Sequence, residues 1–179
     1  MTSPLVAVAA ASYEQAILVF VTMKTMCTES IFLRDMVETF ENEIQVKNAP
    51  GRAFRVAAKA GTADGGRNSC FIADEIHEWN NINLERVHYV LSNNTAKRKD
   101  GLVLNITTAG HDLDSMAGRM YQRGILKEKG KQKDPEFYFK WIGSNEEDNQ
   151  KDEKIQEKVN PDIPNAWWPL EHLRRRMNA

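Results

Sequence analysis

Short apolar runs alternate with longer stretches of mixed polarity from the N-terminus to Gly130. Four of these runs have the length of a strand and carry small, β-branched or aromatic residues: Leu5–Ala10, Ala53–Ala58, Cys70–Glu75 and Gly101–Thr107. Such runs are typical of strands buried in a parallel sheet. Strands that alternate with helices predict an α/β fold with a largely parallel sheet flanked by helices.

The stretches between the runs predict helices. Ser12 and Gln15 have the spacing of a capping box, so the first helix is expected to start there and to run to about Met26. A second helix is expected from about Ser30, because apolar residues recur at helical spacing on one face. Those residues are Leu33, Met36, Val37, Phe40 and Ile44.

Two further helices are predicted before Gly130. One runs from Leu84 to about Ala96. The other begins after Asp112 or Asp114, since either carboxylate can cap the N-terminus of a helix.

The chain changes character beyond Gly130. Phe137–Ile142 is aromatic and strand-like, whereas Ser144–Lys158 is dominated by Asn, Asp and Glu. A charged run of this kind is typical of a solvated loop or helix face. We therefore expect one domain over residues 1–130 and a C-terminal part over residues 131–179.

Composition narrows the function classes. The 179 residues can build one good core and hardly two, and 41% hydrophobic with 27% charged residues is ordinary for a globular domain. A net charge of −1 argues against coating of nucleic acid, although a local basic patch is compatible with it. Polar residues from Ser12 to Gln15 interrupt the apolar N-terminal region, so no membrane association is expected. Cys27 and Cys70 lie far apart, which indicates core residues in a reducing cytoplasm.

The most informative run ends in two adjacent carboxylates, Asp74 and Glu75. Ligands of α/β proteins bind at the carboxyl ends of the strands. There Asp74 can hold Mg²⁺ directly or through water, and Glu75 can orient or deprotonate an attacking water. This is the arrangement of a Walker B strand in an ATP-hydrolysing motor. Adjacent acids at a strand end are also common as solvated turn residues.

Neighbouring motifs strengthen the motor interpretation. A glycine-rich stretch, Gly61–Gly66, precedes the strand, and Asp74–His77 spells a DExH box. Downstream, a strand ends in the paired hydroxyls of Thr107 and Thr108, which in a motor can sense the γ-phosphate. The histidines are too scattered for a metal site and are expected to be structural or at the surface: His77, His88, His111 and His172.

Together these motifs resemble the ATPase region of the tailed-bacteriophage terminase large subunit, a DNA-packaging motor protein. The segments that carry the resemblance lie in the family's order: Val6–Ser12, Phe54–Val56, Gly61–Gly65, Phe71–Trp79, Ile106–Gly110 and Asn160–Pro161. The resemblance implies a RecA/P-loop-NTPase-like sheet, incomplete at its N-terminal side. It also implies a partial ATPase domain over residues 1–130, followed over 131–179 by the end of the ATPase region and a linker toward a nuclease domain.

The resemblance implies roles for individual residues. Asp74 would bind Mg²⁺, Glu75 would activate water, and Thr107, Thr108 and Gly110 would form the coupling motif. The cofactors of the intact parent protein would be ATP and Mg²⁺. Its partners would be double-stranded phage DNA, the portal protein and the small terminase subunit. The motor would act as a homo-oligomeric ring in the cytoplasm of the bacterial host.

The chain also departs from the family pattern. The Walker A loop is expected before Val6, where only five residues stand. Gly61 and Gly66 have the spacing of a phosphate-binding loop, but Arg67 and Asn68 replace its Lys and Ser or Thr, so no residue is assigned to that loop. We therefore expect an internal piece or a truncated product that has little ATPase activity alone.

Two alternatives stay open at the level of the sequence. The DExH box is compatible with a helicase fragment, which would require a second RecA-like domain and further helicase motifs downstream. The missing phosphate-binding loop is compatible with a non-catalytic relic or assembly module.

Overall fold

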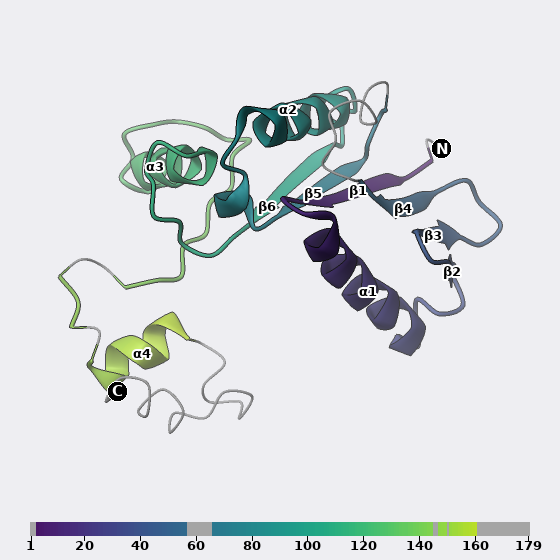
Figure 1. Cartoon of the computed structure of the whole chain (residues 1–179), viewed down its shortest axis with the longest axis horizontal. Helices are drawn as coiled ribbons and strands as arrows, with labels where there is room; N and C mark the ends of the chain where they lie inside the picture. The colour runs from purple at the N-terminus through teal and green to yellow at the C-terminus, as the bar shows by residue number, and fades with distance from the viewer. Residues whose placement is uncertain (1–2, 57–65, 145–146, 150, 161–179) are drawn as a thin grey trace. The chain divides into compact units, whose positions relative to one another are not determined.

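The computed structural model describes residues 3–56, 66–144, 147–149 and 151–160. The chain divides into two compact units, Met1–Lys129 and Gly130–Ala179. The first unit is built around a six-stranded sheet with the order β2-β3-β4-β1-β5-β6 (Figure 1). The functions expected for the two parts, a partial ATPase domain and a linker toward a nuclease domain, stay predictions.

Four strands of the sheet pair with one another in parallel, and two more join the sheet through antiparallel pairs. The parallel strands are β4 (Arg52–Arg55), β1 (Leu5–Ala10), β5 (Cys70–Asp74) and β6 (Leu102–Ile106). The antiparallel strands are β2 (Val37–Thr39) and β3 (Glu43–Val46). This arrangement confirms the predicted α/β fold with a largely parallel sheet.

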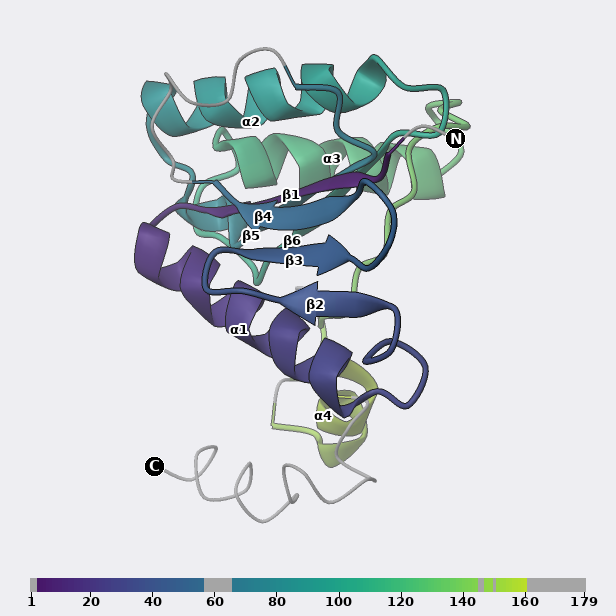
Figure 2. The ribbon, with the colours of Figure 1, turned by 90° about the vertical axis from the view of Figure 1, so that its right-hand side faces the viewer.

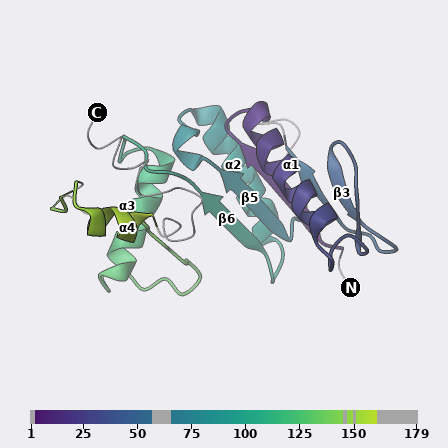
Figure 3. The same cartoon turned by 90° about the horizontal axis from the view of Figure 1, so that it is seen from below.

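Strand β1 lies at the centre of the parallel part, between β4 and β5. Its residues Ala7, Val8 and Ala9 are fully buried, because helices cover both faces of the sheet. Helix α1 (Tyr13–Glu29) contacts β1 and β4, and α2 (Ile82–Ala96) contacts β5 and β6 on the opposite face (Figure 1, Figure 3). Small residues in β1 let both layers approach closely.

The predicted capping box starts α1. The backbone N–H of Gln15 donates to Ser12 Oγ at 3.1 Å, and the N–H of Ser12 donates to Gln15 Oε1 at 3.2 Å. The helix continues to Glu29, three residues beyond the predicted end at Met26.

The main core lies between the sheet and α2. Phe71 of β5, Val87 of α2 and Trp79 of the connection between them are fully buried in it. The other buried members of this core are Ala7, Ala9, Val56, Ala73, Ile76, Leu84, Leu91, Met116 and Ala117. The core therefore packs directly against the strand that ends in Asp74.

The helix predicted from Ser30 is wrong. The segment forms the hairpin β2–β3 instead, and Ile44 pairs with Ala53 of β4 in the sheet (Figure 2). Ile44 is buried in this position. Its apolar neighbours fit helical spacing as well as they fit strands, and pairing with β4 decides between the two.

The caps of the later helices also differ in part from the prediction. Helix α2 begins two residues earlier than Leu84, because Asn81 Oδ1 accepts from the backbone N–H groups of Asn83 and Leu84. Helix α3 (Met116–Glu128) is capped by Ser115, whose Oγ accepts from the N–H of Gly118 at 3.1 Å. The cap predicted at Asp112 or Asp114 is therefore wrong. Asp112 Oδ1 instead accepts from the N–H of Asp114 in the preceding turn.

In the C-terminal unit, the described residues include helix α4 (Glu153–Val159). The strand predicted over Phe137–Ile142 is wrong, since no strand is formed there. The rings of Phe137 and Phe139 stack on each other with centroids 6.3 Å apart. A strand needs a partner for its backbone hydrogen bonds, and none pairs with this segment among the described residues.

Strand β6 is the last strand on its side of the sheet within the described part of the chain. Its side chains alternate: Val103 packs against the core, whereas Leu102, Leu104 and Ile106 are exposed. Cys27 and Cys70 are free and only partly buried, so the expectation that both lie in the core is wrong. The glycine-rich stretch Gly61–Gly66 and the tail after Asn160 fall largely outside the described residues.

Candidate functional site

The carboxyl ends of β5 and β6 bring the two predicted motifs together. The strands are parallel neighbours, and Asp74 is the register partner of Ile106. Asp74 and Glu75 therefore lie beside Thr107 and Thr108, at the sheet edge where α/β proteins bind ligands. This confirms the predicted placement of both motifs.

Asp74 is the last residue of β5, and its backbone is anchored by Trp79. The indole Nε1–H donates to the carbonyl oxygen of Asp74 at 3.0 Å. The pKa of the Asp74 carboxyl is raised, first by burial and then by the neighbouring charge of Glu75. The backbone N–H of Glu75 and the side chain of His77 act in the opposite direction. Two carboxylates held side by side make this edge attractive to a cation.

Glu75 adopts a left-handed backbone conformation, with φ 49° and ψ 52°. A residue with a Cβ pays a steric penalty there, so such a conformation needs support from its surroundings. It ends β5 and starts the short 3-10 turn η1 (Ile76–Glu78). The turn places Glu75 Oε2 at 3.4 Å from the backbone nitrogen of Thr108, which donates to it.

The segment that follows β6 has its own hydrogen bonds. Thr107 Oγ1 donates to the carbonyl oxygen of Thr108 at 2.9 Å and accepts from the backbone N–H of His77 at 3.1 Å. Gly110 also approaches His77, because a Cβ added at Gly110 would stand 3.2 Å from His77 Cβ. The segment that includes Thr107, Thr108 and Gly110 is thus in direct contact with the turn after Asp74.

A comparison with protein-family models identifies the family of the chain. The model of the terminase large subunit, ATPase domain, matches residues 2–125. The chain belongs to this family.

The terminase fold is also found in solved structures. The chain is similar to the large terminase of bacteriophage HK97, with a TM-score of 0.79 and 14% identity over 99% of this chain and 36% of that one. It is also similar to the large terminase of a thermophilic bacteriophage, with a TM-score of 0.51 and 10% identity over 72% of this chain and 32% of that one. The RecA-like α/β arrangement of a terminase ATPase domain is therefore shown. The chain spans about a third of each of these solved chains, and no curated protein sequence matches it.

Two histidines of this terminase domain have contacts that the sequence interpretation missed. His77, expected to be structural or at the surface, lies between Glu75 and Thr107, with its Nδ1 at 3.0 Å from Glu75 Oε2 and 2.9 Å from Thr107 Oγ1. The DExH spelling was the available signal. His88 of α2 is buried, and its Nε2 lies 2.7 Å from Asn105 Oδ1 on β6. No local pattern pointed to that contact.

His88 sits behind the site, within the core. Its ring packs edge-on against Phe71 and Trp79, with centroids 5.4 and 5.7 Å away. Burial lowers the pKa of His88, while the hydrogen bond to Asn105 and the charge of Glu85 partly offset this. A neutral His88 thus joins α2 to the strand that precedes Thr107.

The terminase family implies ATP and Mg²⁺, and the donor set is compatible with that metal. Among the described residues, no group of three or more His, Cys, Asp or Glu side chains is placed to hold a metal ion. In phosphate sites, however, Mg²⁺ takes one or two carboxylates and fills its other positions with water and phosphate oxygens. Asp74 can supply such a carboxylate. Burial and the charge of Glu75 disfavour its ionised form, and a bound cation would relieve that cost.

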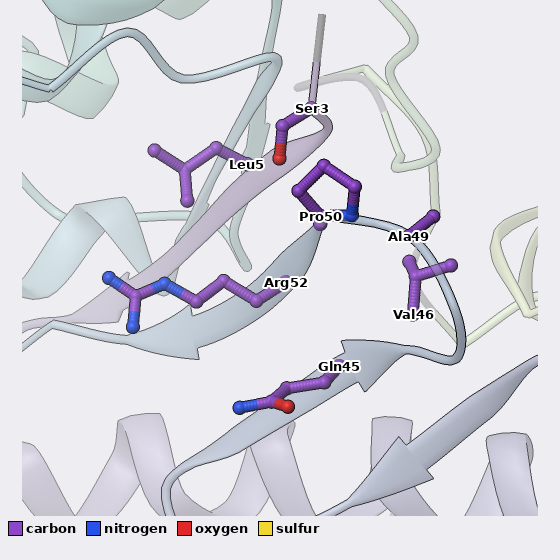
Figure 4. Close-up of a pocket in the computed structure, with 8 residues that line it drawn as sticks. Ser3, Leu5, Gln45, Val46, Ala49, Pro50 and Arg52 are labelled. Carbon is purple, nitrogen blue, oxygen red and sulfur yellow. The ribbon is translucent and has the colours of Figure 1, made fainter.

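A shallow depression elsewhere on the domain is separate from these motifs. It is lined by residues that include Leu5, Val46, Pro50 and Arg52, at the amino ends of β1 and β4 (Figure 4). Asp74 lies at the carboxyl end of its strand, so the depression is at the opposite edge of the sheet. None of the helices in the described ranges has the length and apolar character needed to cross a membrane.

Proposed function

We propose that this chain contributes the Walker B and coupling elements of an ATP-driven DNA-packaging motor. The observation that carries the proposal is the contact between Glu75 Oε2 and the backbone N–H of Thr108, beside Asp74. It joins a carboxylate suited to activating water with a segment that could transmit the effect of ATP hydrolysis to the rest of the motor. The match to the terminase ATPase domain favours this function over a DExH helicase.

Each residue has a distinct proposed role. Asp74 is the residue that would hold Mg²⁺, and the bound ion would neutralise charge on the ATP phosphates. Glu75 would orient the attacking water and accept its proton. Thr107, Thr108 and Gly110 would form the coupling segment, which shares hydrogen bonds and close packing with the turn after β5.

The intact protein's partners follow from the family and are part of the proposal. They are double-stranded phage DNA, the portal protein and the small terminase subunit, contacted by a homo-oligomeric ring in the cytoplasm of the bacterial host. Residues 131–179 would form the end of the ATPase region and a linker toward a nuclease domain.

The test is a chimera that joins this chain to the phosphate-binding segment of a related terminase. We expect Glu75→Gln to lower turnover by about 10²–10⁴-fold while ATP binding is retained, because an amide cannot accept the proton of water. Asp74→Asn should weaken Mg²⁺-dependent binding, and Thr107→Ala with Thr108→Ala should uncouple hydrolysis from DNA movement. Nucleotide affinity, hydrolysis and packaging are measured separately.

Glu78→Gln is the matched control for Glu75→Gln, since both carboxylates contact the ring of His77. It should leave turnover close to that of the parent chimera. Loss of the same step in all variants would contradict the division of roles. An active chimera that is indifferent to Glu75→Gln would contradict the proposed role of Glu75 in activating water.

A further inference from the structure

His77 occupies the junction between the turn after β5 and the coupling segment. Its Nδ1 lies 3.0 Å from Glu75 Oε2 and 2.9 Å from Thr107 Oγ1, while its Nε2 lies 3.0 Å from Glu78 Oε1. One imidazole therefore faces the carboxylate proposed to activate water and a hydroxyl of the coupling segment through the same nitrogen.

Hydrogen-bond accounting shows what that nitrogen must do. An ionised carboxylate can only accept, so the contact with Glu75 requires a hydrogen on Nδ1. Thr107 directs its own hydroxyl hydrogen to the carbonyl oxygen of Thr108, so its oxygen also faces His77 as an acceptor. The single Nδ1–H is thus shared between two competing acceptors, Glu75 Oε2 and Thr107 Oγ1.

We propose that His77 is a positioning residue that holds Glu75 at rest and reports its release to the coupling segment. The inference rests on the proposed role of Glu75. While Glu75 contacts His77, its Oε2 also accepts from the backbone N–H of Thr108 at 3.4 Å. When Glu75 turns toward a water, the Nδ1–H passes wholly to Thr107 and the N–H of Thr108 loses its acceptor.

The surroundings suit an exchange of this kind. The side chains of His77 and Glu75 are 19% and 34% exposed, so water reaches both groups and can replace their contact when it breaks. The backbone of His77 stays in place, because its N–H donates to Thr107 Oγ1 at 3.1 Å. Gly110 also approaches the base of the His77 side chain, since a Cβ added at Gly110 would stand 3.2 Å from His77 Cβ.

Amide hydrogen exchange of the 179-residue chain, followed residue by residue by NMR, tests the contact without nucleotide. Asn at position 77 keeps a donor in the place of Nδ1, whereas Gln keeps one in the place of Nε2 and faces Glu78. We expect the amide of Thr108 to exchange about 2- to 10-fold faster in His77→Gln and His77→Ala, the range that corresponds to one net hydrogen bond. In His77→Asn its rate should match the wild type.

Two further measurements separate a positioning role from a structural one. Glu75→Ala should speed Thr108 exchange to the same extent, and combining it with His77→Ala should add nothing, because both changes break one shared contact. The amide of Leu102, which donates to the carbonyl oxygen of Ser69 at 3.0 Å, reports the stability of β6 and should stay unchanged. Equal rates in His77→Asn and His77→Gln, additive effects, or acceleration of Leu102 together with Thr108 would each overturn the inference.

Turnover in the chimera gives the functional readout. His77→Gln should lower kcat with little change in the KM for ATP, and His77→Asn should restore most of it. A chimera indifferent to Glu75→Gln would overturn the proposed function, whereas the exchange pattern at Thr108 decides the role of His77. Failure of the proposed function and failure of the role proposed for His77 can therefore be told apart.

Discussion

Trp79 donates its indole Nε1–H to the backbone carbonyl oxygen of Asp74 at 3.0 Å. The ring is fully buried, so this bond ties the end of β5 to the core beneath α2. The position of the Asp74 carboxylate thus depends on a residue that cannot itself contact a ligand in solvent.

Trp79→Phe should keep an aromatic ring in the core and remove the donor to Asp74. The Asp74 carbonyl is partly buried, so the loss of its donor together with the smaller ring should lower the free energy of unfolding by about 1–3 kcal/mol. Urea titration followed by circular dichroism measures it. Tyr89→Phe, at an exposed position of α2, is the control and should change stability by less than about 0.5 kcal/mol. Equal effects of the two changes would contradict the role of the indole.

The left-handed backbone of Glu75 makes a second prediction. Glu75→Gly and Glu75→Ala both remove the contacts to His77 and Thr108, but only glycine adopts φ 49° without a steric penalty. Glu75→Gly should therefore be more stable than Glu75→Ala by about 1 kcal/mol in urea unfolding. An alanine variant as stable as the glycine variant would mean that the turn relaxes when the side chain is removed.

Because the pKa of Asp74 is raised, replacing this carboxyl with a neutral amide should increase stability in a pH-dependent way. Folding disfavours the ionised form of this carboxyl and favours the protonated form. The resulting stability is present below the unfolded pKa, near pH 4, and is lost as pH rises through the folded pKa. Asp74→Asn avoids that loss, so its melting temperature should rise relative to the wild type between pH 3 and pH 7.

Asp100→Asn is the control for this prediction, because the Asp100 side chain is 77% exposed. It should show no comparable gain across the same range. If Asp74→Asn gains equally at both ends of the range, ionisation is not the cause and packing of the amide must account for the change.

The lowered pKa of His88 predicts acid sensitivity of the opposite sign. The unfolded chain takes up a proton at this residue near pH 6.5, whereas the folded chain resists it, so stability is present above that pH and is lost as pH falls below it. His88→Gln keeps a donor toward Asn105 without a titrating ring. Its melting temperature should fall less than that of the wild type between pH 7 and pH 5.

His111→Gln, at an exposed position, serves as the comparison for His88→Gln. It should retain the acid sensitivity of the wild type. Parallel curves for the wild type and His88→Gln would show that the acid sensitivity arises elsewhere.

Several elements were predictable because their signals are local. The small apolar residues of Leu5–Ala10 and the capping box of Ser12 and Gln15 need no distant partner, and both appear as expected. The apolar run before Asp74 also indicated a strand, and that strand ends at the edge of the sheet where α/β proteins bind ligands.

Elements that depend on a distant partner became clear when the chain was seen folded. The apolar residues after Ser30 fit a helix until Ile44 is paired with Ala53 of β4. The helix cap moved to Ser115 because its hydroxyl, and not Asp112 or Asp114, reaches the first turn of α3.

The same distinction applies at the candidate site. The local pattern of residues indicated that Asp74 and Glu75 follow one apolar strand and that Thr107 and Thr108 follow another. It could not determine that His77 stands between them, because the contact joins residues thirty positions apart and depends on the parallel pairing of β5 with β6. Strand tendencies and caps are encoded over a few neighbouring residues, whereas the register between strands is chosen by the packing of the whole sheet.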